Sequence, residues 1–256
     1  MQKIDLNCDL GESSAAYADG TESAVLEQIS SANIACGFHA GGPIIMEKAV
    51  AAAKAAGVAV GAHPAFPDRN GFGRREMACT AAEVRAFVLY QLGALGAFTR
   101  TAGIKLQHCK VHGALYNMAA KDLALARAIA EAVALFDSNM ILLAPPASKL
   151  IEAGEALGLR TACEVFADRA YRADGTLLPR SMSGAVFTDA EEIAARARRM
   201  VCEGKVTTVS GEELSLRADS ICVHGDNPAA LEAVRAIRKE LDAAGVAIAP
   251  LQDILF

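Results

Sequence analysis

Four histidines in this chain have a glycine beside them or one residue away, in otherwise apolar or small surroundings. They are His39 in GFHAGG, His63 in GAHP, His112 in VHGALYN and His224 in VHGD. Neutral imidazole accepts protons near neutral pH and binds divalent metals. Glycine permits sharp turns and a close approach of the backbone to a ligand. One such histidine alone favours a structural role, but four together predict that at least two are functional.

Two carboxylates, Asp9 and Glu12, follow the first predicted strand. In such a close pair one group can stay ionised while the other exchanges a proton, although capping of a solvated loop is the alternative. The predicted catalytic residues are Asp9, Glu12, His39, His63 and His112. A divalent metal at Asp9, His39, His63 and His112 would activate water instead. No compact metal motif such as HExxH is present, so the residues leave both chemistries open.

Other polar residues at strand ends and in two long loops are candidates for substrate binding. The loops, residues 62–76 and 164–181, contain arginines that suit carboxylate or phosphate recognition, and an ordinary solvent-facing loop is the alternative. The candidates are Asn7, Arg74, Lys110, Glu164, Asp168, Arg169, His224 and Asp226. The fifth histidine, His108, lies inside a predicted strand without a glycine neighbour, which favours a structural role.

A helix, a glycine and a short β-branched run recur along the chain and indicate alternating helices and strands. The predicted strands lie near residues 4–8, 33–36, 58–62, 105–111, 140–143, 161–166 and 220–224. Parallel strands with helical crossovers predict an α/β fold, a distorted TIM-like (β/α) barrel of about seven strands. An open doubly wound sheet is the alternative. In a barrel, the strand ends that carry the polar residues would meet at one mouth.

Local patterns predict several element boundaries. Thr80 with Glu83, and Thr188 with Glu191, have the spacing of capping boxes at helix starts. Residues 205–216 interrupt the alternation and are predicted to form a β-hairpin that turns at Ser210 and Gly211.

Composition narrows the function classes. The chain has 256 residues, 53% of them hydrophobic, and a formal net charge of -5, without a basic cluster. We therefore predict one domain over residues 1–256 and no nucleic-acid partner. No signal peptide pattern or long apolar run is present, so we expect a cytoplasmic protein that does not bind membranes. Seven cysteines without a CxxC pair argue against a disulfide framework or a zinc knuckle.

Seven motifs spread over the whole chain resemble the LamB/YcsF family. They are DLNCDLGE, NIACGFHAG, GAHPAFPDRNGFGRR, HGALYN, EVFADRAY, DGTLLPR and CVHGD. The resemblance implies a seven-stranded barrel of the glycoside hydrolase/deacetylase superfamily, and it adds Asn117 of HGALYN to the substrate-binding candidates. It also implies the first component of a 5-oxoprolinase, which acts with subunits B and C and converts 5-oxo-L-proline, ATP and water to L-glutamate, ADP and phosphate.

Two alternatives to this function stay open: a stand-alone metal-dependent deacetylase or amidohydrolase, and a non-catalytic component that presents substrate to a partner. No GxxxxGK[ST] loop is present, so the sequence does not locate ATP. The chain also departs from the family pattern. Gly42 stands where an aspartate is usual after His39, and Val111 stands where a proline is usual before His112. The change at Gly42 removes a carboxylate close to His39 in sequence.

Overall fold

The computed structural model describes residues 1–13, 21–223 and 228–255, and its centre is a closed barrel of seven parallel strands. The ring closes because β9 pairs with both β6 and β1. The barrel strands are β1 (Lys3–Leu10), β2 (Ser31–Ala35), β3 (Ala59–His63), β4 (Leu106–Cys109), β5 (Ile141–Ala144), β6 (Arg160–Phe166) and β9 (Ser220–Val223). The predicted TIM-like barrel is confirmed, and the open sheet is wrong.

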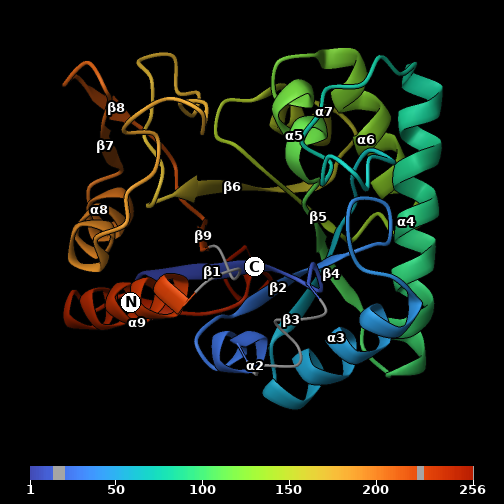
Figure 1. Cartoon of the computed structure of the whole chain (residues 1–256), viewed down its shortest axis with the longest axis horizontal. Coiled ribbons are helices and arrows are strands. Elements are labelled where there is room, and N and C mark those ends of the chain that lie inside the picture. The colour runs from blue at the N-terminus through green and yellow to red at the C-terminus, as the bar shows by residue number, and fades with distance from the viewer. Residues whose placement is uncertain (14–20, 224–227, 256) are drawn as a thin grey trace.

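Helices surround the strands, as Figure 1 shows with α4 at the right and α8 and α9 at the left. They are α2 (Thr21–Leu26), α3 (Pro43–Ala56), α4 (Ala81–Thr101), α5 (Gly113–Ala119), α6 (Leu123–Phe136), α7 (Lys149–Ala156), α8 (Ala190–Cys202) and α9 (Pro228–Ala243). A two-residue strand, β10 (Ala247–Ile248), pairs with the start of β1, and a short 3-10 helix, η1 (Leu251–Asp253), follows it. Within the described residues, no helix is both long and apolar enough to cross a membrane.

The local predictions hold with one exception. Thr80 and Glu83 form a reciprocal capping box at the start of α4. The predicted hairpin is β7 (Lys205–Thr207) paired antiparallel with β8 (Glu213–Ser215). The predicted capping box at Thr188 is wrong by one residue, because Asp189 is the N-cap of α8 and its side chain accepts from the Glu192 N–H. A carboxylate accepts this bond as well as a hydroxyl does.

Alternate residues of β1 separate an apolar layer from a polar barrel interior. Ile4, Leu6 and Cys8 are fully buried members of the apolar core. The residues between them, Asp5 and Asn7, are equally buried and bind polar side chains of other barrel strands. Because successive side chains of a strand face opposite sides, the apolar core lies between barrel and helices and the polar groups fill the barrel.

The base of the polar interior is the Asp5 carboxylate, which accepts hydrogen bonds from the hydroxyls of Ser30, Ser31 and Ser220. Complete burial nevertheless raises the pKa of Asp5 from 3.8 to about 6, because desolvation outweighs these three bonds. The folded state therefore holds a proton on Asp5 in a pH range where the unfolded chain has lost it.

We predict that replacing Asp5 with Asn removes a pH dependence of stability. The wild-type unfolding free energy should fall as pH rises from about 4 to about 6, by roughly 3 kcal/mol relative to Asp5→Asn, since one pKa unit is worth about 1.4 kcal/mol. Urea unfolding at a series of pH values measures this difference. Parallel stability curves for the two proteins would show that Asp5 is not protonated in the folded state.

Candidate functional site

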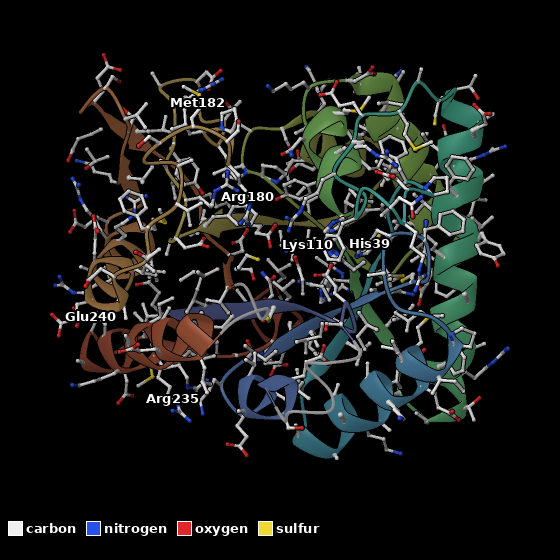
Figure 2. All side chains as sticks on the ribbon, in the orientation of Figure 1. His39, Lys110, Arg180, Met182, Arg235 and Glu240 are labelled. Carbon is white, nitrogen blue, oxygen red and sulfur yellow. The ribbon has the colours of Figure 1, made fainter. Side chains whose placement is uncertain are left out.

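The polar interior ends at the mouth of the barrel in a cluster of histidines and carboxylates. His63 is the last residue of β3, His39 follows β2, and His112 follows β4. All three imidazoles are buried, and the Glu12 side chain, with 16% exposure, reaches closest to solvent. His39 and Lys110 are labelled near the middle of the molecule in Figure 2. The predicted gathering of strand-end histidines is thus present for His39, His63 and His112.

One carboxylate oxygen of Glu12 faces the three imidazoles. Glu12 Oε1 lies 2.8 Å from His39 Nε2, 3.4 Å from His112 Nδ1 and 3.9 Å from His63 Nε2. The rings of His39 and His112 stack with centroids 3.9 Å apart and an interplanar angle of 5°. Gly73 makes this packing possible, since a Cβ at this residue would lie 2.9 Å from atoms of both His39 and His112.

Backbone carbonyls fix the tautomers of two of these imidazoles. His63 Nδ1 lies 2.7 Å from the Lys110 carbonyl, and His112 Nε2 lies 2.9 Å from the Phe72 carbonyl. A carbonyl oxygen only accepts, so both of these nitrogens must carry the proton. In the neutral rings, His63 Nε2 and His112 Nδ1 are therefore bare lone pairs, and they face each other at 2.9 Å.

Two lone pairs at this distance require a positive charge between or beside them. A proton on His63 Nε2 supplies it, because this N–H can donate to His112 Nδ1 and lies 3.3 Å from Asp9 Oδ2. The Asp9 charge raises the pKa of His63 against the opposing effect of burial. The same pairing holds the pKa of Asp9 well below its usual range. His63 and Asp9 thus form an ion pair within the cluster.

The two stacked imidazoles stay neutral. Burial, together with the nearby His63 charge, lowers the pKa of His39 and of His112 to about 3. Burial and the Asp9 charge raise the pKa of Glu12. The cluster therefore combines neutral bases, one imidazolium and a carboxylate that can exchange a proton near the mouth.

The same atoms could hold a divalent cation in place of the proton. Ligand atoms of Glu12, His39, His63 and His112 all lie within 4.8 Å of one another. Metal-binding imidazoles commonly donate their second N–H to a carbonyl, as His63 and His112 do here. The buried Nδ1 of His39 has no hydrogen-bond partner among the described residues. We predicted Asp9 as a ligand, but Glu12 occupies that place in the four-atom group.

A buried lysine, Lys110, contacts Asp9. Lys110 Nζ lies 2.8 Å from Asp9 Oδ1 and 2.8 Å from Glu164 Oε1, and it also donates to Asn7 Oδ1 and Cys222 Sγ. Lys110 is 3% exposed and Glu164 is fully buried. These two residues and Asn7, all predicted to bind substrate, are instead bonded to one another inside the barrel. Tyr116 donates to the second oxygen of Glu164.

The other predicted substrate-binding residues have separate surroundings. Arg74 is exposed and lies over the Phe72 ring at 5.0 Å. Arg169 is buried and donates to the carbonyls of Leu178 and Ala185. Asp168 is half-buried in the loop after β6, and Asn117 is exposed on α5. His224 and Asp226 lie outside the described residues.

Asn33 and His108 belong to the site but were missed as functional candidates. Asn33 Nδ2 donates to Asp9 Oδ1 at 2.8 Å, and His108 Nε2 lies 2.6 Å from Asn33 Oδ1. A sequence signal for Asn33 exists, since Ser31 and Asn33 alternate with apolar residues in β2, as Asp5, Asn7 and Asp9 do in β1.

Comparison with known proteins places the chain in a family. The profile of the LamB/YcsF family matches residues 4–256. This chain belongs to the LamB/YcsF family. A crystal structure of the lactam utilization protein from Thermus thermophilus shares 51% sequence identity, covers 97% of this chain and 99% of that protein, and superposes with a TM-score of 0.91.

Curated relatives in the LamB/YcsF family match at similar identity over nearly their whole length. Proteins named as the A subunit of 5-oxoprolinase are 57% identical in Alkaliphilus metalliredigens and 54% identical in Symbiobacterium thermophilum. The first comparison covers 94% of each chain, and the second covers 97% of this chain and 95% of the relative. The relative of the same name in Clostridium beijerinckii is 52% identical, with 99% of this chain and all of that protein covered.

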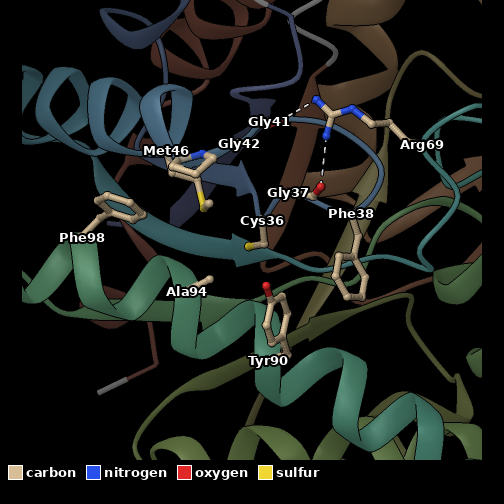
Figure 3. Close-up of a pocket in the computed structure, with 11 residues that line it drawn as sticks. Cys36, Gly37, Phe38, Gly41, Gly42, Met46, Arg69, Tyr90, Ala94 and Phe98 are labelled. Carbon is tan, nitrogen blue, oxygen red and sulfur yellow. Dashed lines mark hydrogen bonds between the residues drawn. The ribbon is translucent and has the colours of Figure 1, made fainter.

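Gly42, where this LamB/YcsF chain departs from the expected aspartate, faces away from the imidazoles. It is the N-cap of α3 and lines a cavity of about 460 Å³ between α3 and α4, which Figure 3 shows together with Phe38, Met46 and Tyr90. A Cβ at Gly42 would meet no atom within 4 Å, His39 included. A Cβ added here would therefore not touch the histidine cluster.

We predict that Lys110→Met destabilises the fold strongly, because it leaves the carboxylates of Asp9 and Glu164 buried without a cation. Breaking a buried ion pair in this way costs about 3–5 kcal/mol. Urea unfolding at neutral pH measures the loss. The control is Lys149→Met, which removes an exposed pair with Glu152 and should leave stability close to wild type. Equal stability of the two variants would contradict the charge balance described here.

Proposed function

We propose that this chain is the A component of a 5-oxoprolinase and takes part in opening the lactam ring of 5-oxo-L-proline. The observation that carries the proposal is the identity of more than half of the residues, over nearly the whole chain, to relatives that bear this name. The name of the related lactam utilization protein supports the same substrate class. The word subunit in the relatives' names supports a multi-subunit enzyme, and we propose subunits B and C as the partners.

The reaction needs ATP because an unactivated lactam is a poor electrophile. Transfer of the γ-phosphoryl group to the lactam oxygen releases ADP and leaves an imidate-like phosphate ester. Water then adds to the ring carbon and loses a proton, and the C–N bond breaks as the nitrogen gains a proton. The resulting acyl phosphate reacts with a second water molecule to give L-glutamate and phosphate. The steps at the ring carbon thus require one proton acceptor and one proton donor.

The histidine cluster supplies both proton functions. Glu12, at the mouth and with a raised pKa, accepts the proton of the attacking water. The proton between His63 Nε2 and His112 Nδ1 is the one donated to the departing nitrogen. Neutral His39, 2.8 Å from Glu12 Oε1, orients that carboxylate. Asp9 stays ionised and keeps His63 charged until the proton leaves.

An arginine at the mouth, rather than the buried lysine, binds the negatively charged carboxylate of the substrate. The ammonium of Lys110 already contacts Asp9, Glu164, Asn7 and Cys222, so we assign it to charge balance. Arg74 is exposed on the loop that carries Phe72, and its charge acts on the neighbouring His39. We therefore propose Arg74 as the partner of the substrate carboxylate.

The donor set at the mouth fits a divalent cation. Glu12, His39, His63 and His112 would hold it, with the two carbonyl-bonded imidazoles already turned so that their lone pairs face the centre. A bound cation would supply Lewis-acid polarisation and a more acidic water molecule. It would compete with the proton on His63, so cation affinity should fall as pH is lowered.

The test is ATP-dependent glutamate formation from 5-oxoproline by this purified chain together with subunits B and C. Asp9→Ala and His112→Ala should each lower the rate by about a hundredfold or more, because each removes part of the proton machinery. Glu131→Ala, which removes an exposed pair with Arg85, is the matched control and should keep full activity. Full activity in both site variants would contradict the assigned roles.

A stand-alone metal-dependent amidohydrolase is the second candidate, favoured by the four ligand atoms within 4.8 Å. Metal analysis of the purified chain and an amide hydrolysis assay without ATP separate the two functions. Amide hydrolysis by this chain alone, abolished by a chelator and restored by zinc or manganese, would favour the second candidate. ATP-dependent activity that requires all three proteins favours the first.

A further inference from the structure

A β-bulge in β4 turns two consecutive side chains into the barrel. Val60 of β3 pairs with Leu106 and Gly61 pairs with His108, so Gln107 is an extra residue in β4. A bulge changes the direction of the side chains next to it, and bulges occur often beside active sites. Here the Gln107 amide binds Ser31 and the His108 ring binds Asn33, both inside the barrel.

The bulge begins a chain of hydrogen bonds whose directions are all fixed. The backbone N–H of Gln252, in η1, donates to Gln107 Oε1 at 3.2 Å. The amide nitrogen of Gln107 must then be the group that lies 3.1 Å from His108 Nδ1, and it donates. His108 Nδ1 is therefore the bare nitrogen, and Nε2 carries the proton. Burial lowers the pKa of His108 to about 3, which keeps the ring neutral.

The protonated nitrogen of His108 sets the orientation of the next amide. His108 Nε2–H donates to Asn33 Oδ1 at 2.6 Å, so Asn33 Nδ2 points the other way and donates to Asp9 Oδ1 and Asn7 Oδ1. Asp9 Oδ1 also accepts from Lys110. Because Asp9 Oδ1 already accepts these two hydrogen bonds, the other oxygen, Oδ2, is the one that faces His63. A flipped Asn33 amide would instead place two oxygens against each other.

Gly61 provides the space for the His108 ring. A Cβ built on Gly61 would overlap three atoms of that ring, Nε2, Cε1 and Cδ2. Glycine in the interior of a strand lowers strand stability, and it often marks a close approach by another group. The approaching group here is the imidazole that orients Asn33.

We propose that His108 is a positioning residue for the catalytic cluster: through Asn33 it holds the Asp9 carboxylate in the orientation that faces His63, and Gly61 is required to admit its ring. The role in catalysis rests on the proposed function, whereas the orientation of Asn33 does not. Loss of a residue that orients a catalytic or metal-binding group costs about ten- to a hundredfold in activity.

The test compares His108→Phe, which keeps a ring but has no donor, with His108→Gln, which keeps an N–H donor. In the assembled enzyme, His108→Phe should lower kcat by about tenfold or more with KM within about twofold, and His108→Gln should retain most of kcat. Gly61→Ala should lower kcat similarly, and it should have no further effect in a His108→Ala background. Unchanged kcat in His108→Phe, or equal losses in the Phe and Gln variants, would overturn the proposal.

A measurement without substrate separates this proposal from the proposed function. In NMR spectra of the labelled chain, the Asn33 side-chain amide protons should exchange slowly in wild type and in His108→Gln, and rapidly in His108→Phe. If wild-type enzyme lacks 5-oxoprolinase activity but this pattern is found, the function is wrong and the orientation of Asn33 stands. Slow exchange in all three proteins would overturn the role of His108.

Discussion

The site depends on one buried charge arrangement, in which the Lys110 ammonium lies between the carboxylates of Asp9 and Glu164. Removing each of these ions from water costs several kcal/mol, which is recovered only with close contacts and complete hydrogen bonding. The barrel interior supplies the 2.8 Å contacts of Lys110 to both carboxylates, a hydrogen bond from a β2 amide to Asp9 and one from a tyrosine hydroxyl of α5 to Glu164. This arrangement fixes Asp9 in its ionised form, and Asp9 in turn keeps His63 protonated.

In the histidine cluster next to this charge arrangement, backbone geometry decides which imidazole nitrogens can react. The carbonyls of Lys110 and Phe72 take up one N–H from His63 and one from His112, so the remaining nitrogens face a common centre with Glu12. The centre therefore accommodates either a proton or a divalent cation. Glu12 is the part of this centre closest to solvent, where a substrate would arrive.

Features that recur along the chain could be predicted from the sequence. Alternating helices and strands predicted the barrel, and equivalent strand ends brought His39, His63 and His112 together. The order of polar and apolar residues in β1 also indicates a polar interior, although only its last residues were predicted to be functional. These features follow from local periodicity, which a single sequence records.

Features that depend on contacts between distant strands could not be read in the same way. The bulge at Gln107 changes the side-chain alternation of β4, so His108 has the appearance of an ordinary buried strand residue in the sequence. We assign Lys110 to charge balance rather than to substrate binding because both of its carboxylate partners come from other strands. Similarly, Gly42 is next to the histidine loop in sequence but faces the cavity beside α3.

The most direct test of the central claim is the protonation state of the two facing imidazoles, measured by nitrogen NMR on histidine-labelled protein without added metal. We predict a proton on His63 Nδ1 and on His112 Nε2, with one further proton shared between His63 Nε2 and His112 Nδ1. A His112 ring protonated on Nδ1 and bare on Nε2, or a His63 ring that stays neutral at pH values near its ordinary pKa, would contradict this claim.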